Sequence, residues 1–303
     1  MSSQPTIHNF SHDAMRTRFW LRIADEDAGY AKSASEGLFH FLDDLDFQIE
    51  AGHDSGPITS INGMPEGALV TASDHVRALW DFSQNLREET GRAFDVAGGR
   101  LFKYWEARGD AVPNPDDPEW TRLWADYQAG SFVLDGAQFT CVKAGAALDF
   151  GGLTRGYALD RMAEMLENNW GIHRALLMAG GSAVLALDPP GDANGWRVGI
   201  GDRSELKLCR FALASKSNAK RPAHLLDLRQ GIPVTLPAPV RAICTGAMEA
   251  EGVALAAAVL SPAEVAELVN RGCSRGAWLP DGSRHGSVAY FEVTERPAPE
   301  AAT

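Results

Sequence analysis

Apolar residues recur at helical spacing along several segments of the chain. Residues 28–49 place apolar side chains three or four positions apart, and residues 73–89 repeat this pattern after Ser73, which is a suitable helix N-cap. The same spacing predicts further helices over 153–168, 247–260 and 262–270. Each of these segments is expected to bury one face against the rest of the protein.

Short apolar or alternating runs between these helices are typical of strands. We predict strands over 17–24, 131–134, 139–143, 146–150, 174–178, 182–187, 196–200, 208–214, 239–244 and 286–293. Stretches rich in Gly, Pro or Asp predict loops over 51–67 and 109–120, the second being a candidate surface insertion. This mixed order, in which strands outnumber helices, favours an α+β fold.

Composition narrows the classes of function. The formal net charge of −12 argues against a nucleic-acid partner, because such a surface would gather Lys and Arg. No run of about 18 apolar residues is present, so no membrane span is expected. The four cysteines form no C-x-x-C pair, and free thiols are the preferred interpretation.

The segment 148–160 carries the most informative motif. Apolar residues lead into Gly151-Gly152, and an amphipathic stretch follows. A helix that starts after glycines presents unpaired N–H groups and the positive end of its dipole, which together favour a phosphate. A tight structural connection is the alternative interpretation of the same glycines.

Seven further segments favour the phosphate-binding interpretation of the Gly-Gly motif. Together with that motif, they occur along the chain in the order known from one protein family. They are Ala14-Met15-Arg16-Thr17, 58–62, 90–95 with Trp105, 179–181, 196–200, His224-Leu225-Leu226-Asp227 with 231–233, and Ala250-Glu251. With 148–160 they resemble the motifs of the ApbE family, the FAD:protein FMN transferases, over about residues 14 to 260. That resemblance implies a two-lobed, T-fold-like α+β architecture with FAD between the lobes. It also implies one ApbE-like domain over 14–295, preceded by an N-terminal extension (1–13) and followed by a disordered tail (296–303).

The resemblance further implies a reaction. The family moves FMN from FAD to a Thr or Ser hydroxyl of an acceptor flavoprotein, within a motif such as Asp-x-x-[ST]-G-A-T, and AMP leaves. His224 matches the His of the family's H-I-I-D motif and is the candidate base, since neutral imidazole accepts a proton near pH 7. A histidine with a structural hydrogen bond is the alternative. The candidate cofactor-binding residues are Met15, Thr17, Asp95, Asp149, Gly151, Gly152, Arg155, Asp160, Gly180, Gly181, Ser215, Ser217 and Asp227.

The resemblance also implies Mg²⁺. Glu251 stands where the family has a metal-binding Asp, and the backbone carbonyl that the family uses maps to Thr154. Mg²⁺ prefers such hard oxygen ligands. The family's next ligand, a Thr, is Leu255 here, and leucine cannot bind a metal. Glu251 as a solvated helix residue, and Asp160 as a surface charge, are the alternatives.

Other positions depart from the family as well, and they keep other functions open. Arg16, Ala97, Ser182 and Ser217 replace family residues, and Lys216 adds a charge. The alternatives are therefore a protein that binds FAD without transfer, an FAD pyrophosphatase that yields FMN and AMP, and a scaffold without ligand. The first residues show no signal peptide or lipobox, so a cytoplasmic location is expected, or a periplasmic one if the gene start is misassigned.

Overall fold

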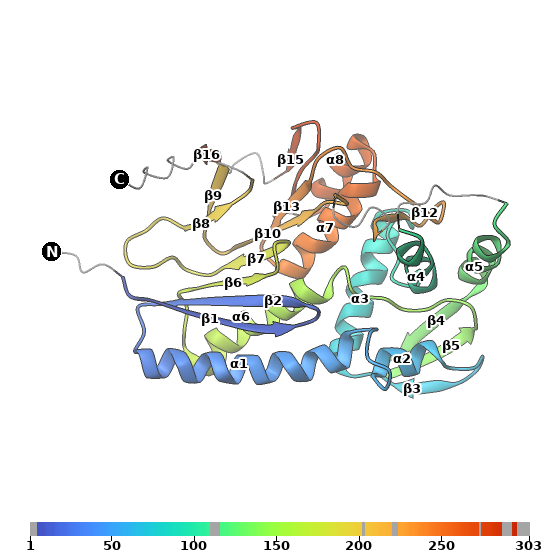
Figure 1. Cartoon of the computed structure of the whole chain (residues 1–303), viewed down its shortest axis with the longest axis horizontal. Coiled ribbons are helices and arrows are strands. Elements are labelled where there is room, and N and C mark those ends of the chain that lie inside the picture. The colour runs from blue at the N-terminus through green and yellow to red at the C-terminus, as the bar shows by residue number, and fades with distance from the viewer. Residues whose placement is uncertain are drawn as a thin grey trace.

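A broad antiparallel sheet forms the centre of the fold (Figure 1). The structure is a computed structural model, and it describes residues 5–109, 116–201, 204–219, 224–272, 274–286 and 293–295. Within these residues the sheet has eight strands, in the spatial order β1 (Ile7–Ala14), β2 (Thr17–Ala24), β6 (Ala175–Ala179), β7 (Ala183–Ala186), β10 (Phe211–Lys216), β13 (Val240–Cys244), β14 (Gly276–Trp278) and β15 (Arg284–Gly286).

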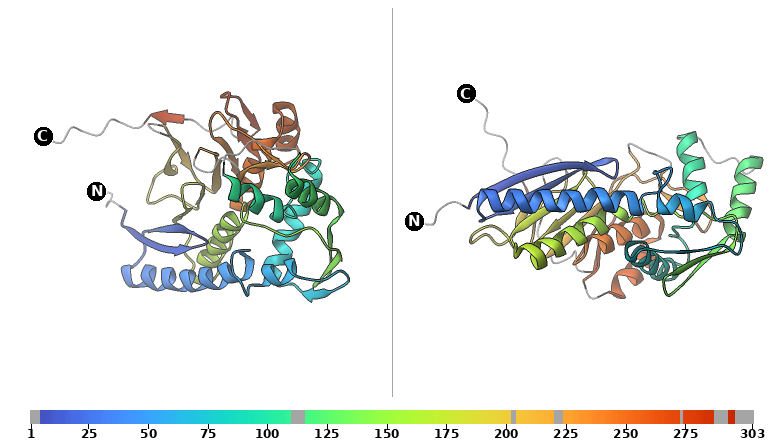
Figure 2. Two further views of the ribbon diagram at one scale, coloured as in Figure 1. Left: turned by 45° about the vertical axis from the view of Figure 1, so that its right-hand side comes forward. Right: turned by 90° about the horizontal axis from the view of Figure 1, so that it is seen from below.

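The two faces of this sheet are covered differently. The helices α1 (Ala28–Ile49), α6 (Thr154–Trp170) and α7 (Ala247–Val259) pack on one face, and α8 (Pro262–Asn270) follows α7. Figure 2 shows α1 and α6 side by side along the sheet. The small sheet of β8 (Trp196–Gly199), β9 (Ser204–Leu208) and β16 (Val293–Glu295) contributes to a second apolar cluster on the other face. Alternation within β6 joins Leu177 to the first core and Leu176 to the second.

A second group of elements lies beside the sheet, at the right of Figure 1. It contains α2 (Pro57–Asn62), α3 (Asp74–Glu89), α4 (Gly99–Arg108), α5 (Pro118–Ala129), β3 (Leu69–Thr71), β4 (Ser131–Asp135), β5 (Gln138–Lys143), β11 (Leu226–Asp227) and β12 (Ile232–Pro233). The buried Trp105 of α4 donates its indole N–H to the Gly231 carbonyl at 2.9 Å. Trp105, Tyr127 and Leu228 share an apolar cluster there. The α+β fold class predicted from the sequence is confirmed.

Most predicted elements are present with shifted ends. The Ser73 side chain accepts the N–H of Val76 and caps α3, as its position predicts. The loop predicted over 51–67 was wrong in part, because Pro57 begins the short helix α2. The insertion predicted over 109–120 falls partly outside the described residues, and its last residues enter α5 at Pro118.

The strand predicted over 146–150 is absent. Only single bridges occur there, and a side chain replaces a neighbouring strand: Asn62 accepts the Leu148 N–H at 2.6 Å and donates to the Leu148 carbonyl at 2.9 Å. The N–H of Asp149 donates to the Val96 carbonyl. This apolar run is therefore fixed in an extended loop that leads directly to the Gly-Gly turn.

Three further differences concern strands. The run 208–214 divides at Arg210, whose φ of 57° turns the chain between β9 and β10. Most of the strand predicted over 286–293 lies outside the described residues, as does the tail 296–303. Residues 7–13, which the sequence analysis placed in an N-terminal extension, pair with β2 as the edge strand β1.

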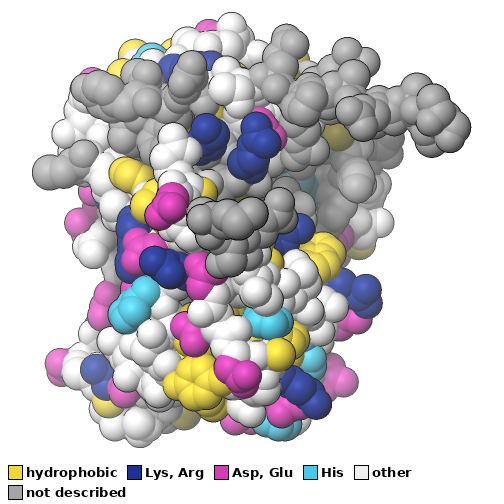
Figure 3. All heavy atoms as spheres, turned by 90° about the vertical axis from the view of Figure 1, so that its left-hand side faces the viewer, with side chains coloured by type: hydrophobic (Ala, Val, Ile, Leu, Met, Phe, Trp, Pro, Cys, Tyr) yellow, Lys and Arg dark blue, Asp and Glu magenta, His cyan; other side chains and the backbone are white. Residues whose placement is uncertain are grey.

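The surface shows no segregation of charge on the face drawn in Figure 3, where Lys and Arg side chains are interspersed with Asp and Glu. Among the described residues, no helix combines the length and the hydropathy needed to cross a bilayer.

Candidate functional site

A cavity of about 320 Å³ lies where the central sheet meets the second group of elements. It is lined from both sides, by the β1–β2 turn, the start of α6, the end of β10 and α7, and by α4 and the segment that leads into β11. The predicted site residues that line it are Met15, Asp95, Asp149, Gly151, Gly152, Arg155, Ser215, Ser217 and His224. The predicted residues Thr17, Thr154, Asp160, Gly180, Gly181, Asp227 and Glu251 are not part of this lining.

The Gly-Gly turn places the start of α6 at the cavity wall. Asp149 Oδ1 accepts the Gly151 N–H at 2.7 Å, which fixes the turn. The N-cap residue Leu153 makes no side-chain hydrogen bond to the helix that begins with Thr154, and the Glu251 carboxylate accepts one N–H of its first turn. Arg155 lies in its first turn and lines the cavity, and it forms no ion pair within the described part of the chain. A helix start and a guanidinium on one wall favour an anionic ligand.

The β1–β2 turn forms the opposite rim. Met15 and Arg16 occupy the two positions of the turn, with φ of 49° and 56°. Positive φ at both positions is what a two-residue hairpin loop with a type I′ turn requires. Glycine suits that conformation best, and Arg16 adopts it with a side chain that reaches into the rim. Behind the rim, a Cβ at Gly180 would lie 2.6 Å from Thr17 Oγ1. Thr17 and Gly180 therefore pack against each other and shape the turn.

Glu50 is a lining residue that the sequence analysis missed. It ends α1, and its buried carboxylate accepts the hydroxyl of Thr154 at 2.6 Å. Burial raises the pKa of Glu50, whereas the hydrogen bond from Thr154 lowers it. No motif marks this position, since it follows an ordinary helical pattern. The hydrogen bond holds the Thr154 hydroxyl against Glu50, and Thr154 itself does not line the cavity.

Lys216 and Glu251 form a buried ion pair at the back of the cavity. Lys216 Nζ lies 3.0 Å from Glu251 Oε1 and 3.2 Å from the Gly152 carbonyl oxygen. Their side chains are 6% and 0% exposed. The other carboxylate oxygen, Oε2, accepts the Gly156 N–H at 3.0 Å. Burial lowers the pKa of Lys216, and the Glu251 carboxylate opposes that shift.

The side chains around Glu251 do not offer the oxygen ligands that Mg²⁺ needs. Both oxygens of Glu251 already accept hydrogen bonds, one of them from an ammonium group. Leu255 packs against Gly152, where a Cβ would come within 2.6 Å of Leu255 Cδ1. Among the described residues, no three His, Cys, Asp or Glu side chains are grouped to hold a metal ion. Mg²⁺ needs several oxygen ligands that are free to bind it.

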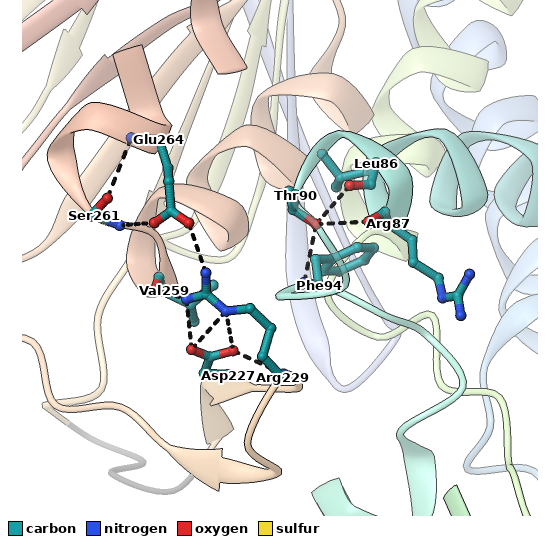
Figure 4. A network of polar contacts seen from close by, with 9 residues as sticks. All are labelled: Leu86, Arg87, Thr90, Phe94, Asp227, Arg229, Val259, Ser261 and Glu264. Atoms are coloured by element: carbon teal, nitrogen blue, oxygen red, sulfur yellow. Dashed lines mark hydrogen bonds and ion pairs between the residues drawn. The ribbon is translucent and has the colours of Figure 1, made fainter. Parts of the chain in front are cut away.

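Two predicted carboxylates belong to other networks. Asp95 is buried and accepts hydrogen bonds from Arg87 Nε at 2.6 Å and the Tyr127 hydroxyl at 3.0 Å. Asp227 is buried beside Arg229, whose guanidinium also reaches Glu264 on α8 (Figure 4). These contacts hold the two loops that carry lining residues of the cavity.

Asp160 lies on α6, and its side chain points to the start of α7. Its oxygens accept the N–H groups of Ala247 and Met248, at 2.7 and 2.9 Å, and so cap α7. Desolvation raises the pKa of Asp160 to about 6, against the effect of these two hydrogen bonds. It lines a second cavity, beside α3 and α7.

His224 approaches the main cavity from the segment before β11. It is half-buried and lines the cavity, as do Ser215 and Ser217 at the end of β10. The cavity thus combines an imidazole, hydroxyls, an arginine and a helix start. That set can bind an anion and accept a proton from a nucleophile.

Comparison with known proteins identifies a matching family. The ApbE family profile matches residues 15–277. The chain is 27% identical over 189 residues to an FAD:protein FMN transferase of Treponema pallidum (strain Nichols), covering 58% of this chain and 52% of that protein. It is 24% identical over 247 residues to an FAD:protein FMN transferase of Klebsiella pneumoniae (strain 342), covering 77% and 75%. The chain therefore spans about half the length of the first of these relatives.

Solved structures share the fold. The flavinyl transferase ApbE of Pseudomonas stutzeri, in its apo form, superposes with a TM-score of 0.78 at 22% identity, over 97% of this chain and 95% of that one. The flavin transferase ApbE of Vibrio cholerae gives a TM-score of 0.79 at 18% identity, over 96% and 97%. The architecture is thus preserved at low sequence identity.

Proposed function

The chain belongs to the ApbE family, and from that premise we propose that it is an FAD:protein FMN transferase. Both curated relatives described above carry that activity in their names. The observation that carries the proposal is the placement of His224, Arg155 and the Gly151-Gly152 turn around one cavity. The chemistry of flavin transfer needs a base, a cation and a phosphate-binding turn at the same place.

FAD is proposed to bind in this cavity, between the two lobes. The diphosphate would lie at the start of α6, near Gly152 and Arg155, because the helix dipole and the guanidinium favour anions there. Ser215 and Ser217 offer hydroxyls on the facing wall. Met15 would border the flavin, since it forms the apolar part of the rim.

The proposed reaction is an in-line displacement at the FMN phosphorus. The acceptor Thr or Ser oxygen forms a new P–O bond, and the P–O bond to the bridging oxygen of the diphosphate breaks. AMP leaves with that oxygen, and the hydroxyl proton passes to a neutral His224 imidazole. The acceptor is proposed to be a flavoprotein segment of the type Asp-x-x-[ST]-G-A-T, which would enter through the open side of the cavity.

No step of this proposal passes through Mg²⁺. The resemblance to the family led us to expect Mg²⁺ at Thr154 and Glu251, but the hydrogen bonds of Glu251 and the leucine at position 255 do not offer the ligands it needs. The charge of the diphosphate is met by residues of the chain itself in the proposed complex.

Incubation with FAD and an acceptor protein tests the proposal. AMP release together with covalent flavin on the acceptor is the expected result, and replacing the acceptor Thr by Ala should abolish the label. Release of AMP with free FMN would instead identify a pyrophosphatase. Tight FAD binding without AMP would identify a binding protein that has lost transfer.

A further inference from the structure

The buried ammonium of Lys216 occupies a position that suits a cation. It lies between the Gly152 carbonyl oxygen, at 3.2 Å, and the Glu251 carboxylate, at 3.0 Å. An ammonium group has three N–H donors, and the described residues accept two of them through these contacts. Lys216 also lines the cavity, and its third N–H donor has no acceptor among the described residues.

The packing of α6 on α7 explains why this position is closed to a metal ion. Gly152 faces Leu255, and one turn further along Gly156 faces Glu251. The leucine side chain fills the space where an oxygen ligand four residues after Glu251 would lie. A divalent ion bound to Glu251 would also meet Lys216 at close range, and such repulsion in a low-dielectric site is severe.

We propose that the Lys216 ammonium is the resident cation of this site, and that the chain binds the diphosphate of FAD without a divalent metal. The inference rests on the proposed function, because it names the group that meets the diphosphate charge. Lys216 lies near Arg155, whose positive charge lowers the pKa of the Lys216 ammonium group. Two cations on one wall would suit a dinucleotide diphosphate, which carries two negative charges.

The wild-type chain provides the first test. After exhaustive dialysis against EDTA, FAD affinity is measured by quenching of flavin fluorescence, and again in millimolar MgCl₂. We expect the two dissociation constants to agree within about twofold, because no divalent ion takes part. Mn²⁺ replaces Mg²⁺ in a parallel electron paramagnetic resonance titration, and no stoichiometric binding is expected with or without FAD.

A double variant provides the second test. Lys216→Met alone would leave the Glu251 carboxylate buried and unpaired, which risks unfolding. Lys216→Met with Glu251→Gln removes both charges and keeps an oxygen for the Gly156 N–H. We expect this variant to unfold cooperatively but to bind FAD about tenfold more weakly or worse, with no recovery in MgCl₂. Lys207→Met, at an exposed lysine on β9, is the matched control and should bind FAD as the wild type does.

The outcomes separate this inference from the proposed function. FAD binding that requires Mg²⁺, stoichiometric Mn²⁺ binding, or a folded double variant with unchanged FAD affinity would each overturn the inference and leave a transferase possible. Metal-independent FAD binding, lost in the double variant but without any transfer to an acceptor, would support the inference and contradict the proposed function. Absence of FAD binding under all conditions would overturn both.

Discussion

Asp160 and Glu251 each cap the helix that carries the other. Asp160 on α6 accepts the first N–H groups of α7, and Glu251 on α7 accepts the Gly156 N–H in the first turn of α6. From the first contact to the second, the chain moves four residues forward along α6, from Gly156 to Asp160, and four residues back along α7, from Glu251 to Ala247. The two helices therefore run antiparallel where they meet. The arrangement satisfies N–H groups that a helix start leaves unpaired, and it fixes Glu251 beside the cavity.

The close approach of these helices predicts a large effect at Gly156. A Cβ at this position would lie 2.5 Å from the Ala247 carbonyl oxygen, and backbone cannot move aside as a flexible side chain can. Gly156→Ala should therefore lower the free energy of unfolding by about 3 kcal/mol, measured by urea denaturation. Gly52→Ala is the control, because nothing lies within 4 Å of its Cβ. Equal stability of the two variants would contradict the close packing of α6 on α7.

Asp160 should make stability depend on pH. Its pKa is raised from 3.8 to about 6 in the folded protein, so the folded state binds the proton more tightly than the unfolded state does. Its contribution to stability is then greatest below pH 3.8 and is lost as the pH rises through about 6. The unfolding free energy of the wild type minus that of Asp160→Asn should fall by about 2 kcal/mol over this window, after allowance for solvent screening.

Urea titrations at several pH values measure this difference. Asp192→Asn, at an exposed carboxylate, controls for the loss of one charge. A difference between wild type and Asp160→Asn that stays flat, or that grows with pH, would show that the hydrogen bonds from α7 outweigh desolvation.

His224→Ala should slow transfer with little effect on binding. Loss of a general base typically costs about 10² to 10⁴ in rate, while the phosphate-binding groups stay in place. Single-turnover AMP release and FAD affinity are measured side by side, with His40→Ala at an exposed position of α1 as the control. An unchanged rate of transfer would reject His224 as the base.

Arg155→Met should weaken FAD binding. The guanidinium lines the cavity and forms no ion pair within the described residues, so its removal leaves the protein stability nearly unchanged. We expect about a tenfold loss of FAD affinity and a smaller dependence of that affinity on salt. Arg22→Met, at an exposed arginine of β2, should bind FAD normally. If both variants bind FAD equally well, Arg155 does not face the diphosphate.

Local patterns in the sequence determined several helices, the family and part of the candidate site. The apolar spacing of 28–49 and 73–89, and the cap at Ser73, predict α1 and α3 because a helix is specified by neighbours three or four positions apart. The ordered motifs over about residues 14 to 260 predict the family, and the family profile confirms it over residues 15–277. They also led to the expectation that the Gly151-Gly152 turn, Arg155 and His224 share a site, and these residues do line one cavity.

Tertiary structure alone decided which groups meet across the chain. Asn62 binds the backbone of Leu148, 86 positions away, and so keeps an apolar run from becoming a strand. Lys216 meets Glu251 across 35 positions, which turns an expected metal ligand into half of a buried ion pair. Periodicity describes only the neighbourhood of each residue. The partner of a buried charge is set by how distant helices and strands pack, and no local pattern in the sequence encodes that contact.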